Sequence, residues 1–348
     1  MKTYALCSAA AAAIVLAGCV RKVETGPPGT GPSPVVHGMP ALPSAESGET
    51  RKASKQYRVG VTLLNRVHAF YVTLEKSMVA EAKALGIDLV VQSGDEDALQ
   101  QKNQIEDFVQ QKMDAIVVCP VDSASVGGAV KHANAAGVPV FTADIGADEG
   151  EVVAHIATDN VDGGRRAGRF LAEAIGGRGK VVILDRPDVT SVQDRVKGFL
   201  DVMAEHPGIE VVDKPDAKGN REEALARMQD MLIRHPDMNG VFCINDDTAL
   251  GALAAVEASA NAPKDLVMVG YDATDEAREK IRAGTFLKAD VVQYPDRIGA
   301  VTIRTVVDYL DGRLKWKPGD ETKVIPIEAG ILTRDDLMKA GDAPAEGR

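Results

Sequence analysis

The chain has 348 residues, a length typical of about two domains. Hydrophobic residues make up 45% and charged residues 26%, so a globular core can form. The formal net charge of -11 argues against a nucleic-acid-binding protein, which usually has a basic face, and against binding to an anionic membrane through charge alone.

The N-terminus has the pattern of an export signal. Met1 and Lys2 form a short basic start, and an Ala-rich apolar run follows that is too short for a comfortable membrane span. The run ends in "LAGC", which resembles the lipobox of bacterial lipoproteins, in which the Cys is lipidated and becomes the first mature residue. We therefore expect a signal peptide over residues 1–18 and a lipid anchor at Cys19. An ordinary cleaved signal with a chance Cys is the alternative.

Residues 19–55 are rich in Pro, Gly, Ser and charge and have no apolar period. Such a composition cannot bury a core, so the segment is predicted to be a flexible tether. A disordered tail over residues 338–348 is predicted for the same reason. Cys119 and Cys243 each end a strand-like apolar run, and we expect both to be free and structural.

Between the tether and the tail, ten apolar runs of strand length alternate with segments of helical spacing. Runs rich in Val and Ile without polar alternation are typical of strands covered on both faces, and strand–helix alternation indicates parallel sheets. The runs are "YRVGVTLL" (57–64), "IDLVV" (87–91), "AIVVC" (115–119), "VPVFTA" (138–143), "VAHIAT" (153–158), "KVVIL" (180–184), "IEVV" (209–212), "GVFCI" (240–244), "LVMVGY" (266–271) and "LKADVV" (287–292).

Ten strands would make one overlong sheet, and a repeated sequence pattern divides them into two sets. "MDAIVVCPVDSAS" begins at Met113 and "MNGVFCINDDTAL" begins at Met238, so that Asp122 and Asp247 fall at the same offset. The sequence therefore predicts two similar α/β lobes, with the echoed turns facing one cleft beyond the carboxyl ends of the strands.

Many α/β chains carry signatures of catalysis, and this sequence has none of the common ones. No Gly-rich dinucleotide turn follows the first strand, no G-x-S-x-G elbow occurs, and the six His residues have no metal-ligand spacing. "GGRGK" at Gly176 only superficially resembles a phosphate loop, because Val181 stands where Ser or Thr should follow Lys180. We therefore expect no enzyme activity, no cofactor and no metal.

Polar groups, often beside an aromatic residue, recur at the predicted strand ends. Aromatic faces cover the C–H face of a sugar ring, while carboxylates, Arg, Asn and Gln bind its hydroxyls. Each residue alone could equally be a helix N-cap, but together they favour a ligand site. The candidates are Phe70–Tyr71, Asp144, Asp159–Asn160, Arg195, Asn245–Asp246, Tyr271–Asp272 and Gln293.

Seven segments closely resemble the ribose-type periplasmic sugar-binding proteins, the substrate receptors of bacterial ABC importers. The likeness runs in order over about residues 56 to 333 and implies two Rossmann-like lobes, joined by three hinge strands, that close on a sugar. The segments are "HAFYVTLEKSMVAEAKALGIDLVV", "CPVDSASVGGAVKHANAAGVPVFTAD", "EVVAHIATDNVDGG", "DRVKGF", "FCINDDTALGAL", "MVGYDATDE" and "ADVVQYPDRIGA".

This resemblance implies roles for individual residues. Phe70 and Tyr71 would stack on the ligand ring, and Asp144 would be the main hydroxyl acceptor of the first lobe. The second lobe would contribute hydrogen-bonding residues, with a tyrosine beside them and a glutamine at a hinge: Arg195, Asn245, Asp272, Tyr271 and Gln293.

Several positions depart from the ribose pattern. Cys119 and His68 each stand where that pattern has Asn, and Ile145 stands where it has Arg. The region 218–219 lacks the second-lobe aromatic residue. Cys119 and His68 remain candidate ligand contacts, but the lost donors put ribose in doubt and favour a different pentose, a polyol or a cyclitol such as inositol.

The function that the resemblance implies is that of a lipid-anchored solute-binding protein. It would capture a pentose, hexose, polyol or inositol and deliver it to an ABC permease. The alternative is a sugar sensor that presents the ligand to a chemoreceptor or membrane sensor kinase; a sugar-responsive repressor is disfavoured because a signal and tether replace any helix-turn-helix. We expect a periplasm-facing monomer that touches a membrane through its N-terminal lipid and binds no nucleic acid.

The expected lobe boundaries follow from three chain crossings, near Thr158–Asp159, Gln293–Tyr294 and Pro326–Ile327. The N-terminal lobe is predicted to comprise residues 56–158 and 294–326, and the C-terminal lobe residues 159–293 and 327–337.

Overall fold

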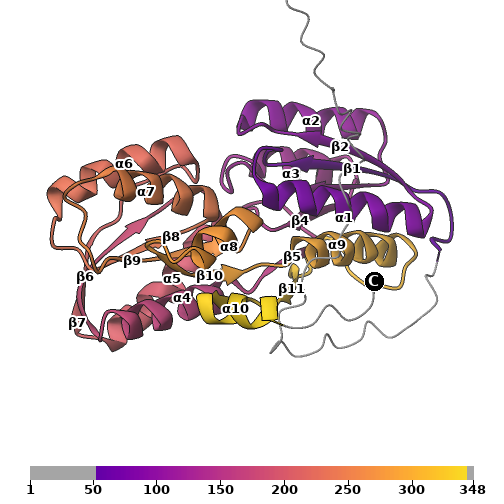
Figure 1. Cartoon of the computed structure of the whole chain (residues 1–348). Coiled ribbons are helices and arrows are strands. Elements are labelled where there is room, and N and C mark those ends of the chain that lie inside the picture. The colour runs from indigo at the N-terminus through magenta and orange to yellow at the C-terminus, as the bar shows by residue number, and fades with distance from the viewer. Residues whose placement is uncertain (1–51, 343–348) are drawn as a thin grey trace, which may run out of the picture. The chain divides into compact units, whose positions relative to one another are not determined.

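The computed structural model describes residues 52–342, so the predicted signal peptide, Cys19 and all but the end of the tether lie outside the described residues. Figure 1 shows two sheets, each flanked by helices. The first sheet has the strand order β11-β5-β4-β3-β1-β2, and every neighbouring pair is parallel. Its strands are β1 (Arg58–Leu63), β2 (Asp88–Ser93), β3 (Ala115–Val118), β4 (Val140–Ala143), β5 (Ala154–Thr158) and β11 (Lys323–Ile327).

The second sheet repeats this topology, with the order β12-β10-β9-β8-β6-β7. Its pairs are parallel except for β10 with β12, which is antiparallel. The predicted fold class, two similar lobes built on parallel sheets, is confirmed. The strands are β6 (Arg178–Leu184), β7 (Gly208–Asp213), β8 (Gly240–Cys243), β9 (Val267–Asp272), β10 (Leu287–Val292) and β12 (Gly330–Thr333).

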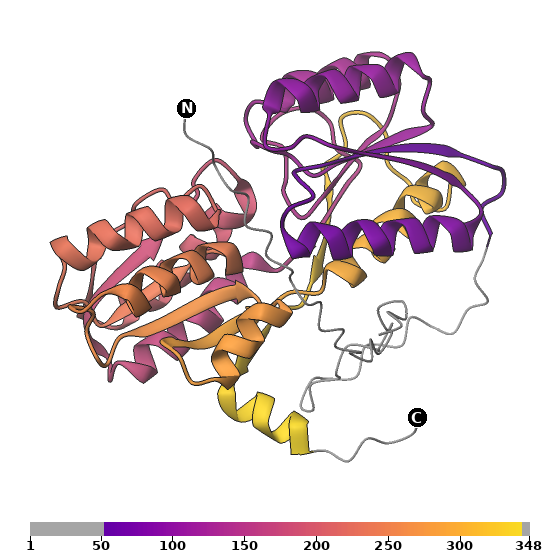
Figure 2. The same ribbon diagram turned by 45° about the horizontal axis from the view of Figure 1, so that its top comes forward.

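Helices cover both faces of each sheet, as Figure 2 shows from a second direction. The first sheet with its helices is called the first lobe: α1 (Ala69–Leu85), α2 (Ala98–Gln110), α3 (Gly127–Ala135) and α9 (Pro295–Leu310). The second sheet with its helices is the second lobe: α4 (Asn160–Ala174), α5 (Thr190–Glu205), α6 (Arg221–Arg234), α7 (Asp246–Ala258), α8 (Asp275–Arg282) and α10 (Arg334–Asp342). None of these described helices has the length and apolar character needed to cross a bilayer.

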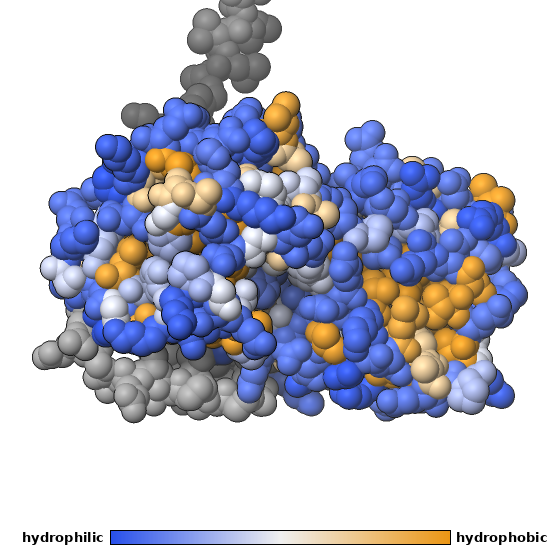
Figure 3. All heavy atoms as spheres, turned by 180° about the vertical axis from the view of Figure 1, so that it is seen from behind, coloured by the Kyte–Doolittle hydropathy of each residue, from blue (hydrophilic) through white to orange (hydrophobic). Residues whose placement is uncertain are grey.

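The sheets form because their central strands can be buried on both faces. Every residue of β3, β4 and β8 is buried, as expected for short Val- and Ile-rich runs between two helix layers. Figure 3 shows one face of the molecule, which is mostly polar and carries some patches of apolar residues. The core therefore lies between sheet and helices, and the strand ends are left to carry polar groups.

The chain crosses between the sheets three times: after β5, after β10, and between β11 and β12. The crossing segments are hydrogen-bonded to one another. Thr158 Oγ1 donates to Gln293 Oε1 at 2.5 Å, and the Asp159 N–H donates to the Ile327 carbonyl at 2.8 Å. β11 runs toward the crossing and the chain continues through it into β12, so β12 runs away from the crossing and is antiparallel to β10, whose carboxyl end points toward it.

Three details differ from the sequence-based expectations. β11 and β12 are additional edge strands, and β11 was hidden because it is largely exposed and contains Pro326, which edge strands tolerate. Residues 338–342 lie in α10 instead of a disordered tail, since Asp336 accepts hydrogen bonds from the N–H and hydroxyl of Thr333 at the start of this helix. The last tether residues join the first lobe, where the Ala53 N–H donates to the Leu85 carbonyl.

Candidate functional site

A cavity that is partly open to solvent lies where the carboxyl ends of strands from both sheets meet. Residues that follow β1, β4, β6, β8, β9 and β10 contribute to its wall, as expected for parallel sheets whose ligands bind beyond the strand ends. Most of the sequence-predicted site residues line it: His68, Phe70, Tyr71, Asp144, Arg195, Asn245, Asp272 and Gln293.

The first lobe contributes an aromatic pair and one carboxylate. Phe70 and Tyr71 begin α1, whose buried residues recur at helical spacing, and their rings meet edge to face at 5.2 Å. The Tyr71 hydroxyl donates to Asp144 Oδ2 at 2.6 Å, whereas the buried Asp144 Oδ1 has no donor within the described residues. Asp144 has a φ of 65°, a left-handed conformation that is uncommon for non-Gly residues. Burial raises the pKa of Asp144, and the nearby charge of Arg195 opposes that shift.

The second lobe contributes a guanidinium held by three partners. Arg195 Nε donates to Asn160 Oδ1 at 2.9 Å, Nη1 donates to the Ile244 carbonyl at 2.7 Å, and the guanidinium lies over the Tyr271 ring at 4.0 Å. Asn160 also accepts from the Tyr271 hydroxyl at 3.0 Å. The arrangement requires α4 and α5 to approach closely. A Cβ at Gly164 would lie 2.0 Å from the Arg195 carbonyl oxygen, so glycine is needed there.

Asp272 lies beside this guanidinium at the end of β9. Its Oδ1 is 4.0 Å from Arg195 Nη1 and accepts from Gln293 Nε2 at 2.6 Å. Burial raises its pKa well above the usual range, and Arg195 opposes the shift. Because Gln293 also accepts from Thr158, it links a ligand-facing carboxylate to the crossing between the lobes.

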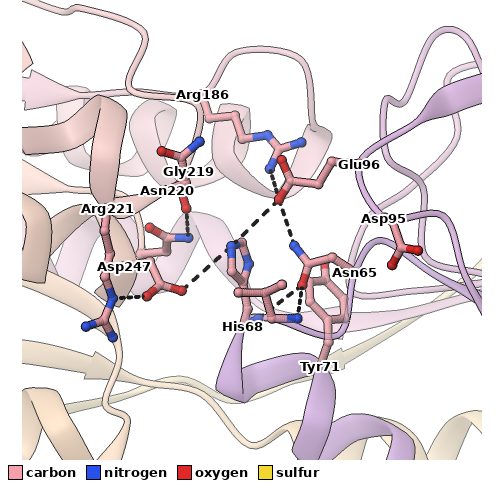
Figure 4. A network of polar contacts seen from close by, with 12 residues as sticks. Asn65, His68, Tyr71, Asp95, Glu96, Arg186, Gly219, Asn220, Arg221 and Asp247 are labelled. Carbon is pink, nitrogen blue, oxygen red and sulfur yellow. Dashed lines mark hydrogen bonds and ion pairs between the residues drawn. The ribbon is translucent and has the colours of Figure 1, made fainter. Parts of the chain in front are cut away.

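A polar network borders the cavity where the two lobes meet (Figure 4). His68 Nε2 lies 3.6 Å from Asp247 Oδ2 of the second lobe and 3.8 Å from Glu96 Oε1 of the first. Burial lowers the pKa of His68, and the two carboxylates oppose the shift. Arg186 of the second lobe lies 4.0 Å from the same Glu96 oxygen and donates to the Val121 carbonyl of the first lobe at 3.2 Å.

The candidates Asp159, Asn160 and Asp246 do not line the cavity, and neither do two that lie behind its wall, Cys119 and Tyr271. Cys119 is fully buried, because it extends the apolar run of β3 into the core, and burial raises the pKa of its thiol well above the usual range. Tyr271 is also fully buried, and its ring packs against the Arg195 guanidinium. The sequence placed both at a strand end but could not show which face their side chains occupy.

Sequence reasoning missed Arg186 and an apolar part of the wall. Arg186 directly follows Asp185 at the end of β6, so the strand-end rule that selected the other residues could have found it. Ile145 was recognised only as a departure from the ribose pattern. The further lining residues are Leu64, Val189, Ser191, Val192 and Ile244.

The chemistry of the wall suits a neutral, hydroxyl-rich molecule. Two carboxyl groups, of Asp144 and Asp272, and two guanidiniums, of Arg186 and Arg195, line the wall, which therefore offers both acceptors and donors. Carboxylates and guanidiniums bind hydroxyl groups, and the aromatic pair offers an apolar face. Within residues 52–342, no group of three or more His, Cys, Asp or Glu side chains is arranged to hold a metal ion.

Comparison with known proteins agrees with this geometry. A ribose import binding protein of Escherichia coli is 37% identical over 253 residues, covering 72% of this chain and 83% of the relative. The ribose import binding protein of Bacillus subtilis is 35% identical over 260 residues, covering 74% and 83%. A Caulobacter myo-inositol binding protein, solved with myo-inositol, superposes with a TM-score of 0.74 at 28% identity, covering 83% of this chain and 97% of that one.

The sequence also matches the family described as "periplasmic binding protein domain" over residues 59–314, which is most of the chain. The match runs from β1 to α9 and includes the two crossings after β5 and β10. The chain therefore belongs to the periplasmic binding protein domain family, whose members bind substrates and are not enzymes.

Proposed function

We propose that this protein captures a neutral, monosaccharide-like ligand between its lobes and delivers it to an ABC permease. The carrying observation is the cavity at the strand ends, where Asp144 and Asp272 face it from different lobes. The similarity to ribose import binding proteins supports both the ligand class and the import role. The family supports a periplasmic or cell-envelope location.

Within this proposal, Phe70 and Tyr71 cover the apolar face of the ligand. Asp144 and Asp272 accept from its hydroxyls, and Arg195, Asn245 and Gln293 complete the polar contacts. His68 borders the ligand at the meeting of the lobes. Arg186 joins the site as a second guanidinium, while Cys119 and Tyr271 act only from behind the wall.

The lobes are proposed to close on the ligand by rotation about the three crossings. We take residues 56–158 with 294–326 as one moving body and residues 159–293 with 327–337 as the other. Small-angle scattering should show a smaller radius of gyration when a tight ligand is added. An unchanged radius at saturation would argue against closure.

The ligand is proposed to be a pentose other than ribose, a polyol or a cyclitol. Ile145 lines the cavity where the ribose pattern has a guanidinium, and a buried hydroxyl left without a partner costs about 1–3 kcal/mol, which is roughly tenfold to a hundredfold in affinity. Mass spectrometry of the molecule released from denatured protein would identify it. Calorimetry across pentoses, hexoses, polyols and inositols would then rank the ligands, and ribose as the tightest would overturn the argument.

We further propose that the mature protein is a monomer anchored to a membrane through lipidated Cys19, which lies outside the described residues. The support is the "LAGC" pattern after a basic start and an apolar run. Cys19→Ala should abolish the incorporation of radiolabelled palmitate. Palmitate that still enters this variant would contradict the anchor.

A further inference from the structure

A buried pair of carboxyl groups lies behind the cavity wall in the second lobe. Asp246, the first residue of α7, is 2% exposed, and Asp290, in the middle of β10, is 0% exposed. The register of β9 with β10 places Asp290 opposite Gly270. A Cβ at Gly270 would lie 2.7 Å from Asp290 Oδ2 and 3.2 Å from Asp246 Oδ1, so both carboxyl groups converge on the space that this glycine leaves.

Each carboxyl group holds one backbone amide of the segment that follows Asp272. Asp290 Oδ1 accepts from the Ala273 N–H at 3.2 Å, and Asp246 Oδ2 accepts from the Thr274 N–H at 2.6 Å. This segment needs holding, because Asp272 has a φ of 118° and Ala273 a φ of 54°, both unfavourable for residues with a side chain. The pair therefore fixes the backbone that aims Asp272 into the cavity.

The other oxygen of each carboxyl group, Asp246 Oδ1 and Asp290 Oδ2, is buried and has no donor within residues 52–342. No ion pair in that part of the chain involves either residue. The titratable groups that interact most strongly with the pair are acidic: Asp247 on the same helix, Asp272 on β9 and the Cys243 thiol on β8. The guanidinium next along the segment, Arg278 of α8, donates its Nε–H to the Ala273 carbonyl.

Two adjacent buried carboxylates without a cation cannot both be ionised. Burial raises the pKa of Asp246 and raises that of Asp290 well above its usual range, and the charge of Asp246 raises the latter further. A single proton between the two unpartnered oxygens would satisfy both of them. It would also leave the outer oxygens free to accept from Ala273 and Thr274.

We propose that Asp246 and Asp290 share one proton between Asp246 Oδ1 and Asp290 Oδ2, and that this pair positions Asp272 for ligand binding. The positioning role rests on the proposed function, whereas the shared proton does not. Loss of the proton at alkaline pH would leave two facing negative charges and release the segment. Ligand affinity should therefore fall as the pH rises through the titration of the pair.

Amide variants test the shared proton without any ligand. In Asp246→Asn or Asp290→Asn, the new N–H₂ group can donate where the proton lay, while the amide oxygen still accepts the backbone N–H. In the double variant, two N–H₂ groups face each other and neither has an acceptor. Urea denaturation measures the free energy of unfolding of the full chain. Each single variant should be about as stable as wild type. The double variant should lose far more stability than the two single variants lose together. Additive effects, or single variants as unstable as the double, would overturn the proposal.

The positioning role is tested by calorimetry with whichever of D-ribose, xylitol and myo-inositol binds most tightly. Asp290→Asn should bind within about threefold of wild type at neutral pH and lose the alkaline decline, whereas Asp290→Ala should bind at least about tenfold more weakly because the Ala273 N–H loses its acceptor. Asp265→Asn, at an exposed position, is the charge control. If the unfolding free energies are non-additive but all variants bind the ligand with equal affinity, the positioning role is overturned and the shared proton is not. Failure of wild type to bind any pentose, polyol or inositol would refute the proposed ligand class, while the unfolding measurements would still decide the shared proton.

Discussion

The turns after β3 and β8 occupy the same place in the two lobes but serve different purposes. In the first lobe, the turn is held by Gln101, whose side-chain oxygen accepts from the Val121 N–H and whose amide donates to the Cys119 carbonyl. In the second lobe, Asn245 caps α7 by accepting from the Thr248 N–H and also lines the cavity. One backbone plan thus supports a structural turn in one lobe and a binding turn in the other.

The same asymmetry extends to the whole site. The first lobe offers two aromatic rings, Ile145 and the carboxylate of Asp144, whereas the second offers both guanidiniums. The second-lobe side is also fixed in position, because Asn160, Ile244 and the Tyr271 ring hold the Arg195 side chain without a ligand. Groups fixed in advance lose less freedom on binding, so we expect the second-lobe side to contribute more to affinity.

The largest expected effect is that of Arg195→Ala. The change leaves buried Asp272 without its nearest cation and removes the donor to Asn160. Removing a buried, hydrogen-bonded charge from a binding interface costs about 2–5 kcal/mol, which is roughly thirtyfold or more in affinity. Calorimetry with the identified ligand measures it. Arg227→Ala, whose guanidinium contacts the Asp216 carbonyl away from the cavity, should bind as wild type does. A loss of less than tenfold in Arg195→Ala would remove the proposed contribution of the second lobe.

Asp144→Asn should weaken binding by a smaller amount on the first-lobe side. The amide can still accept from Tyr71, but one charged acceptor is lost, which corresponds to about 1.5–3 kcal/mol, or roughly tenfold to a hundredfold in affinity. Asp122→Asn, at the echoed turn outside the cavity, is the matched control and should leave the affinity unchanged. Equal losses in both variants would show that the effect is general and not specific to the site.

The pH dependence of stability should also separate the lobes. Burial raises the folded-state pKa of Asp144 in the first lobe, and it raises that of Asp272 in the second lobe well above the usual range. The unfolded chain therefore releases these protons first, so stability falls as the pH rises from about 4 through each folded-state pKa. Asp272→Asn should flatten the curve of unfolding free energy against pH more than Asp144→Asn does. A steeper curve in either variant would contradict the sign of the shift.

The smallest effect is expected for Cys119→Ala. Because this side chain is buried in the first-lobe core and does not line the cavity, ligand affinity should stay within about twofold, while stability should fall by about 1 kcal/mol. Cys243→Ala, also fully buried, is the matched control in the second lobe. Calorimetry and thermal unfolding measure the two quantities. A tenfold loss of affinity would show that Cys119 contributes to ligand binding.

Local pattern was sufficient for the fold class and for most of the cavity wall. Ten apolar runs predicted β1 to β10, because strands buried on both faces must be apolar throughout. The residues that follow such strands are polar because they leave the core, which is why Asp144, Asn245, Asp272 and Gln293 could be selected. The edge strands β11 and β12 were not predicted, because β11 is largely exposed and needs no apolar run, and β12 is a run of only four residues.

Tertiary structure decided which strand-end side chains face the cavity and which face the core. Cys119 and Tyr271 point inward, whereas Arg186, which has the same kind of position, reaches the cavity and the opposite lobe. It also brought Asp246 and Asp290 together from sites 44 residues apart through the pairing of β9 with β10 and the gap at Gly270. A single sequence records which residues end a strand. The direction of a side chain and its distant partner depend on register and helix packing, which only the folded chain defines.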